Sequence, residues 1–147
     1  MNKINKFLTD YIQNISSSVL NTDMDKLNFA ADTILKAIKQ KRTIFVCGNG
    51  GSAAIANHYV VDFIKYFRER TTYQPRIISL SDNIETITAI SNDMDYKYIF
   101  SYQAESLCKN NDIVIIISSS GNSKNVVELL KYTKKNKIKT IGFSGFQ

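Results

Sequence analysis

The sequence has little of what cross-links a chain or anchors it in a membrane. Its 147 residues include one proline, two cysteines, one histidine and no tryptophan. The two cysteines do not form a CxxC pair, and two thiols cannot build a disulfide framework. No apolar run reaches the roughly 18 residues of a membrane span, and the N-terminus has no continuous apolar segment. We therefore expect no membrane partner, no signal peptide and a cytoplasmic location.

The composition is that of one globular domain. With 44% hydrophobic and 22% charged residues, the chain can bury a core, which excludes intrinsic disorder. The net charge is +6, and much of the excess lies in segment 131–139. A positive charge can attract nucleic acids or anionic metabolites. Because no recognition motif accompanies these lysines, we interpret them as a solvated helix face and expect no nucleic-acid partner.

Residues 1–42 form a predicted helical segment. Apolar residues recur at helical spacing over 3–20 and 24–40, and either Thr22 or Asp23 can cap the second helix. The two apolar stripes need a surface to cover them. Either a partner subunit or the sheet of the same chain can cover them. We assign the segment to oligomerisation.

Residues 43–147 alternate between strand and helix patterns. Strands are predicted at 43–47, 76–80, 112–118 and 138–143, and helices at 52–67, 83–91, 96–108 and from 121 to about 135. The five consecutive aliphatic residues in 113–117 are typical of a central parallel strand buried on both faces. The pattern predicts an α/β fold, a doubly wound parallel sheet whose strand-to-helix loops meet at the carboxyl edge.

The first of these loops is rich in glycine. It contains Gly48, Gly50 and Gly51, and Ser52 stands where a helix N-cap or a ligand-contacting hydroxyl would be. Together with Ala53 the loop also fits a loose dinucleotide pattern. The acidic residue expected about 20 positions further on is missing, so a dinucleotide-dependent oxidoreductase is the weakest of the interpretations we consider.

The loop after the central strand is rich in serine. Four hydroxyls and a glycine in 118–123 precede a helix, and free backbone amides at a helix N-terminus suit a phosphate group. The loop lacks the Gly-Lys-Ser/Thr ending of a Walker motif. A capped turn with spare serines is the alternative.

The single histidine, His58, is followed four residues later by Asp62, so the two share one helix face. Such a pair can bind a metal, act as an acid and base, or be an ordinary surface contact.

Three motifs occur in order along the chain: CGNGGSAAIANH at Cys47–His58, SND at Ser91–Asp93 and SSSGNSKNV at Ser118–Val126. Together they resemble the sugar isomerase (SIS) domain, and specifically the phosphoheptose isomerases. The resemblance implies a phosphorylated sugar as substrate, an aldose–ketose isomerisation, a bound zinc ion and a homotetramer assembled through the N-terminal helices.

The resemblance also implies roles for individual residues. The residues that would contact the sugar are Asn49, Gly50, Gly51, Ser52, Asn92 and Asp93, and those that would hold the phosphate are Ser118, Ser119, Ser120 and Ser123. His58 matches a metal-binding histidine, and Asp62 matches the proton-transferring base that also binds the metal.

The sequence departs from the family pattern in three places. Asp62 stands where glutamate is usual, and Tyr66 stands where arginine is usual. The family's fifth strand and following helix, with a glutamine and a second histidine, have no counterpart before Gln147. We therefore expect residues 43–147 to be a SIS phosphosugar-binding domain that is incomplete at its C-terminus, with an incomplete metal shell.

Two functions follow from the resemblance. The first is isomerisation of sedoheptulose 7-phosphate to D-glycero-D-manno-heptose 7-phosphate through an enediol, for lipopolysaccharide or capsule. The alternative is a non-catalytic SIS module that binds a phosphosugar and regulates or scaffolds a protein partner.

Overall fold

The computed structural model describes residues 2–145, which divide into two compact units. The first unit ends at Thr33 and the second begins at Ile34, within helix α2 (Met24–Lys39). The predicted division, after residue 42, thus lies nine residues further along the chain than the boundary between the compact units, after Thr33.

The first unit contains α1 (Lys3–Leu20) and the beginning of α2. The Asn2 side chain accepts a hydrogen bond from the Ile4 N–H, and Asp23 accepts one from the Lys26 N–H at 3.0 Å. Of the two capping residues left open for α2, Asp23 is therefore the one that caps. No side chain of α1 is buried.

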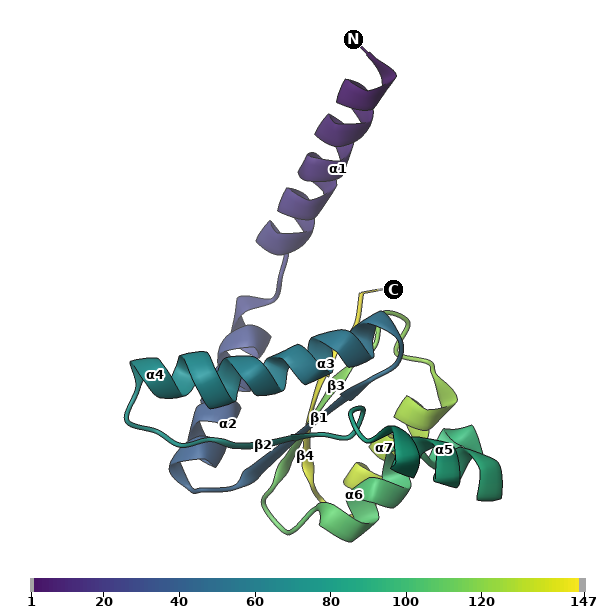
Figure 1. Cartoon of the computed structure of the whole chain (residues 1–147). Coiled ribbons are helices and arrows are strands. Elements are labelled where there is room, and N and C mark those ends of the chain that lie inside the picture. Colours follow the sequence, from purple (N-terminus) through teal and green to yellow (C-terminus); the bar gives the residue numbers. More distant parts are fainter. Residues whose placement is uncertain (1, 146–147) are drawn as a thin grey trace. The chain divides into compact units, whose positions relative to one another are not determined.

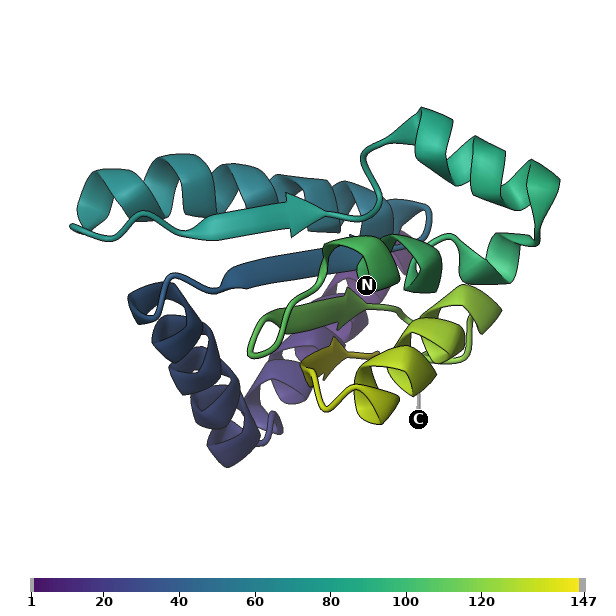
Figure 2. The same cartoon turned by 90° about the horizontal axis from the view of Figure 1, so that it is seen from below.

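The second unit is built on a sheet whose four described strands are all parallel (Figures 1 and 2). The strands are β1 (Thr43–Gly48), β2 (Arg76–Ser79), β3 (Ile113–Ile117) and β4 (Lys139–Phe143). Their order is β2-β1-β3-β4, so β1 and β3 are the central strands. The central position of β3 confirms the prediction from its five aliphatic residues. The family resemblance implies five strands, and the described residues form four.

The helices of this unit follow the strands in alternation. They are α3 (Gly51–Val61), α5 (Ile84–Asp93), α6 (Ser101–Leu107) and α7 (Lys124–Lys135). The first continues without a break into a π-helix, η1 (Asp62–Phe67), and a last turn, α4 (Arg68–Arg70). Among the described helices, none is long and apolar enough to cross a membrane.

One predicted helix differs from the structure. The single helix expected at 96–108 is instead a 3-10 turn, η2 (Tyr96–Tyr98), followed by the separate helix α6. The Asp95 side chain accepts a hydrogen bond from the Lys97 N–H at 2.8 Å, and the Tyr98 N–H bonds to the Asp95 carbonyl at 3.0 Å. These local bonds favour the tighter turn over a continuous α-helix.

Apolar side chains pack on both faces of the sheet. Alternate residues of β1 point to opposite sides, so Phe45 joins a cluster with Leu129 of α7, whereas Ile44 joins a cluster with Ala56 of α3. Figure 2 shows the corresponding layers, with α3 on one side of the sheet and α6 and α7 on the other. The fold is therefore the predicted doubly wound α/β sheet.

Candidate functional site

The glycine loop and the serine loop meet at one cleft at the carboxyl edge of β1 and β3. Its volume is about 250 Å³. Six side chains line it: Asn49, Ser52, Ser118, Ser119, Ser120 and Ser123. All six belong to the residues predicted to contact a phosphosugar, and their roles stay predictions.

Tight backbone geometry brings the glycine loop to the cleft. Gly50 has a φ of +53°, a conformation that favours glycine. A Cβ on Gly48 would lie 2.6 Å from the Ser52 carbonyl carbon, so only glycine allows this close approach. The structure corrects the predicted cap: Gly50 is the N-cap of α3, and Ser52 lies inside the first turn, where its hydroxyl makes no hydrogen bond within residues 2–145.

The serine loop presents hydroxyl hydrogens that have no acceptor. The Ser118 hydroxyl oxygen accepts from the Gly121 N–H at 3.2 Å, and the Ser120 hydroxyl oxygen accepts from the Asn122 N–H at 3.3 Å. Within residues 2–145, none of the four lining serines of this loop donates its hydroxyl hydrogen. Each is therefore available as a donor to a ligand.

The two helices that begin at the cleft lack the side-chain caps that three other helices of the chain have. Helices α1, α2 and α5 are each capped by an Asn or Asp side chain. By contrast, α3 and α7, which both begin at the cleft, have no side-chain cap, and neither does the short helix α6. The N-cap of α7 is Ser123, a residue type that ordinarily caps, yet its hydroxyl makes no such bond. In α7 the N–H groups of Lys124 and Asn125 have no acceptor within residues 2–145 and are left for a ligand. In α3 only the Gly51 N–H is left, because the next two N–H groups donate to the carbonyls of Asn49 and Gly50.

A buried asparagine, to which we assigned no role from the sequence, joins the two loops. Asn125 of α7 is 1% exposed, and its side-chain amide pairs reciprocally with that of Asn49, at 2.9 Å and 2.8 Å between the two pairs of N and O atoms. The Tyr96 hydroxyl also donates to Asn49 Oδ1, at 3.0 Å. Asn125 lies within the motif Ser118–Val126 and Tyr96 lies shortly after the motif Ser91–Asp93, but neither motif reveals that these residues bond to Asn49.

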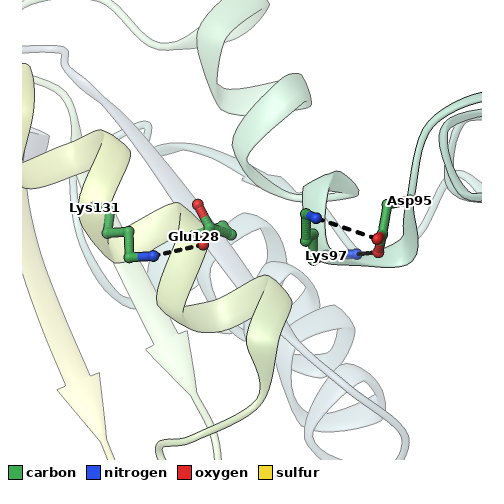
Figure 3. A network of polar contacts seen from close by, with 4 residues as sticks. All are labelled: Asp95, Lys97, Glu128 and Lys131. Carbon is green, nitrogen blue, oxygen red and sulfur yellow. Dashed lines mark hydrogen bonds and ion pairs between the residues drawn. The ribbon is translucent and has the colours of Figure 1, made fainter.

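The turn that carries Tyr96 is held by charge as well as by backbone bonds. The Asp95 carboxylate lies 3.3 Å from the Lys97 ammonium group, and Figure 3 shows this contact beside the separate Glu128–Lys131 pair of α7. The hydrogen bond from the Lys97 backbone N–H lowers the pKa of Asp95 below its usual value, and the Lys97 ammonium group lowers it further. Both interactions favour the ionised form of Asp95, whose carboxylate accepts the hydrogen bond at the start of η2.

Asn92 and Asp93 do not line the cleft. They lie at the exposed end of α5, where the Asn92 amide donates to the Asp93 carboxylate at 2.8 Å. Their predicted contact with the sugar hydroxyls stays a prediction.

His58 and Asp62 form a pair on the helix that leaves the cleft, away from the cleft lining. The distance between His58 Nε2 and Asp62 Oδ1 is 3.5 Å, and the side chains are 69% and 47% exposed. The α-helix becomes a π-helix at Asp62, and such changes are frequent at functional sites. Within residues 2–145 there is no group of three or more metal-binding side chains, so this pair offers two of the ligands of a zinc site and does not complete one.

Cys47 precedes the glycine loop directly and would be the obvious candidate for a nucleophile. It is fully buried in β1, and burial, with a smaller contribution from Cys108, raises the pKa of its thiol to about 12. Because the thiolate is the reactive form, Cys47 serves as a core residue.

Two larger hollows lie elsewhere on the second unit. One of about 490 Å³ is lined by parts of β2, α5 and α6, and one of about 380 Å³ lies between α6 and α7. Size favours these hollows, whereas two uncapped helix N-termini and the dense hydroxyls favour the smaller cleft. We identify the cleft as the candidate site because of that chemistry.

Comparisons with known proteins agree on one family. Residues 8–145 match the family model described as "SIS domain". A probable phosphoheptose isomerase of Thermoplasma acidophilum is 42% identical over 136 residues, which are 92% of this chain and 74% of that protein. The phosphoheptose isomerase of Campylobacter concisus is 36% identical over 122 residues, 83% of this chain and 64% of that protein.

A solved structure shows the same fold. The phosphoheptose isomerase of Neisseria gonorrhoeae superposes with a TM-score of 0.84 at 26% identity, covering 97% of this chain and 73% of that one. This chain spans about two thirds to three quarters of the length of these three relatives. This chain belongs to the SIS-domain family and, within it, to the group of the phosphoheptose isomerases.

Proposed function

We propose that the cleft binds the phosphate group of a phosphorylated sugar. The observation that carries this proposal is the set of undonated serine hydroxyl hydrogens beside the uncapped N-termini of α3 and α7. Hydroxyl and backbone N–H donors match the acceptor oxygens of a phosphate, and the two helix dipoles favour its negative charge. No charged side chain lines the cleft among the described residues, so neutral donors would hold the anion.

We further propose that the reaction is an aldose–ketose isomerisation, with sedoheptulose 7-phosphate as substrate and D-glycero-D-manno-heptose 7-phosphate as product. The names of the relatives support this substrate. The reaction needs a base that removes a proton from the carbon beside the carbonyl and returns it to the neighbouring carbon, through an enediol. Phosphate binding, remote from these carbons, supplies binding energy that orients them.

Asp62 is our candidate for the base. The cleft lining holds hydroxyls and one amide but no carboxylate, so the base lies outside the lining. Asp62 is half-exposed, one turn from His58, on the helix that begins at the cleft. Zinc enters no step of this mechanism, because His58 and Asp62 alone do not make up a zinc shell.

We also propose that the chain self-associates as a tetramer through α1. The apolar side chains of this helix that are at least 47% exposed are Ile4, Phe7, Leu8, Tyr11, Ile12, Ile15, Val19 and Leu20. Contiguous exposed apolar surface of this kind favours a protein interface. Light scattering that gives the mass of a single chain would contradict this assembly. In the cell, we propose, the isomerase reaction supplies heptose for lipopolysaccharide or capsule.

The decisive experiment incubates the chain with sedoheptulose 7-phosphate, follows the aldose product by NMR and measures binding by calorimetry. We expect turnover in the wild type. Asp62→Asn removes the base, so kcat should fall by about 100-fold or more while the Kd changes little. Glu69→Gln, an exposed acidic residue further along the same helix, is the matched control and should leave both unchanged.

Other results would lead to different conclusions. Full activity of Asp62→Asn would mean that another group is the base. Wild-type binding without turnover would favour the alternative, a non-catalytic module that regulates or scaffolds a protein partner, which suits a cleft lined only by neutral groups. Neither binding nor turnover would contradict the proposed function.

A further inference from the structure

We propose that Asn125 and Tyr96 are positioning residues that act through Asn49. They fix its amide so that Asn49 offers the cleft a hydrogen-bond donor and no acceptor. The inference rests on the proposed function, because it concerns how the same cleft selects its ligand. It assigns a function to two residues of which one is nearly fully buried and the other does not line the cleft.

A single backbone group fixes the direction of every hydrogen bond in this network. The Val126 N–H donates to one side-chain atom of Asn125 at 2.9 Å, and a backbone N–H can only donate. That atom is therefore Oδ1, and the other atom of the Asn125 amide is Nδ2, a donor. The atom of Asn49 that faces Nδ2 must accept, so it is Oδ1, and the Tyr96 hydroxyl must donate to it.

The consequence for Asn49 is a defined set of remaining bonds. Its Oδ1 accepts two hydrogen bonds, from Asn125 Nδ2 and from the Tyr96 hydroxyl, which occupies both lone pairs. Its Nδ2 donates one hydrogen to Asn125 Oδ1. Within residues 2–145 one amide hydrogen of Asn49 is left over, in a side chain that lines the cleft.

The ligand chemistry follows directly. The group that faces Asn49 must be a hydrogen-bond acceptor, such as a carbonyl, phosphate or hydroxyl oxygen, and a group that can only donate is rejected. Because the Asn49–Asn125 pair spans 76 positions of the sequence and joins both loops, it also holds them at one separation before the ligand arrives.

Asn125 is a difficult residue to test by deletion, since its loss leaves the buried Val126 N–H without a partner and can unfold the chain. Tyr96→Phe is the safer variant. Tyr96 is 53% exposed, and the substitution removes only the hydroxyl that donates to Asn49. Tyr102→Phe is its matched control, because Tyr102 is 49% exposed and lies on α6, away from Asn49.

The experiment is a cycle of four chains: wild type, Tyr96→Phe, Asn49→Ala and the double variant. Calorimetry measures the Kd for sedoheptulose 7-phosphate, and urea unfolding confirms that each chain is folded. We expect Tyr96→Phe to weaken binding about 3- to 10-fold, the loss of one neutral hydrogen bond. In the Asn49→Ala background the same change should have no further effect, since the tyrosine acts through Asn49. Tyr102→Phe should bind as the wild type does.

The outcomes separate this inference from the proposed function. If the wild type binds and Tyr96→Phe weakens binding equally in both backgrounds, or in neither, the positioning role is wrong and the proposed function stands. If the wild type does not bind the sugar phosphate at all, both are wrong. Loss of the Tyr96→Phe effect only where Asn49 is absent supports the inference.

Discussion

Gly50 has a backbone conformation that a side chain makes costly, with φ +53° and ψ −122°. A Cβ at this position would have no atom within 4 Å, so space is not the constraint there. Its neighbour Gly51 has the same open surroundings but begins a helix. Substituting each glycine in turn therefore tests the cost of the backbone conformation without the added cost of a steric clash.

We predict that Gly50→Ala lowers the free energy of unfolding by about 1–3 kcal/mol, the usual cost of a non-glycine residue held in such a conformation. Gly51→Ala, by contrast, should leave it unchanged or raise it by about 0.5 kcal/mol, because alanine restricts the unfolded chain. Urea unfolding of the two variants measures both values. Equal effects would show that the loop relaxes freely and that the conformation of Gly50 does not shape the cleft.

Single residues are also where sequence reasoning reached its limit. The six residues that line the cleft are among those predicted to contact a phosphosugar. The serines stood out because the ends of parallel strands meet at one edge, whereas Asn49 was named only through the family resemblance. Asn125 was not, because nothing local distinguishes an asparagine that faces solvent from one that pairs with a residue 76 positions earlier. Of the two interpretations of Ser52, the helix N-cap is wrong, because Gly50 is the N-cap, and the contact with a ligand stays a prediction.

At the scale of elements, α5 and α7 both have a polar N-cap residue of a type that ordinarily caps a helix, but only the one of α5 makes the capping hydrogen bond. Asn83 accepts a hydrogen bond from the Thr86 N–H at 2.7 Å, whereas the Ser123 hydroxyl makes no capping bond. An N-cap side chain ordinarily contributes about 1 kcal/mol to stability. The structure therefore separates a side chain that caps its helix from a hydroxyl that makes no capping bond.

We predict opposite effects for the two alanine variants. Asn83→Ala should lower the free energy of unfolding by about 1 kcal/mol and leave the Kd for sedoheptulose 7-phosphate unchanged. Ser123→Ala should change stability by less than about 0.5 kcal/mol but weaken binding about 10-fold, since it removes a donor to a charged group. Chemical unfolding and calorimetry on the same samples provide both numbers. A Ser123→Ala variant that is destabilised yet binds normally would make Ser123 a structural residue.

The types of the elements and the ends of the strands followed from the sequence pattern, whereas two features of the helices did not. Each of the four strands lies within two residues of its predicted bounds, because continuous aliphatic runs are bounded by polar turns. The helix predicted at 96–108 was divided by the local bonds of Asp95, and the π-helix at Asp62 has no pattern in the sequence that announces it. The first deviation comes from side-chain and backbone hydrogen bonds that hydropathy does not record.

At the scale of the whole chain, topology was predictable because few arrangements satisfy alternating strands and helices with right-handed crossovers. That rule places every strand-to-helix loop at one edge and explains why two loops about 70 residues apart form one cleft. It does not decide what His58 and Asp62 contact, since these residues lie further along a helix, outside the lining of the cleft.

The most direct test of the central claim follows backbone amide signals by NMR while sedoheptulose 7-phosphate is added. If the cleft holds the phosphate, the amides of Ser119, Ser120 and Ser123 should shift together and saturate at one ligand concentration, because their N–H groups have no acceptor within residues 2–145. Thr86 and Ser106, which line the larger hollow, should not move. Saturable shifts at Thr86 and Ser106 with none in the serine loop would contradict the account.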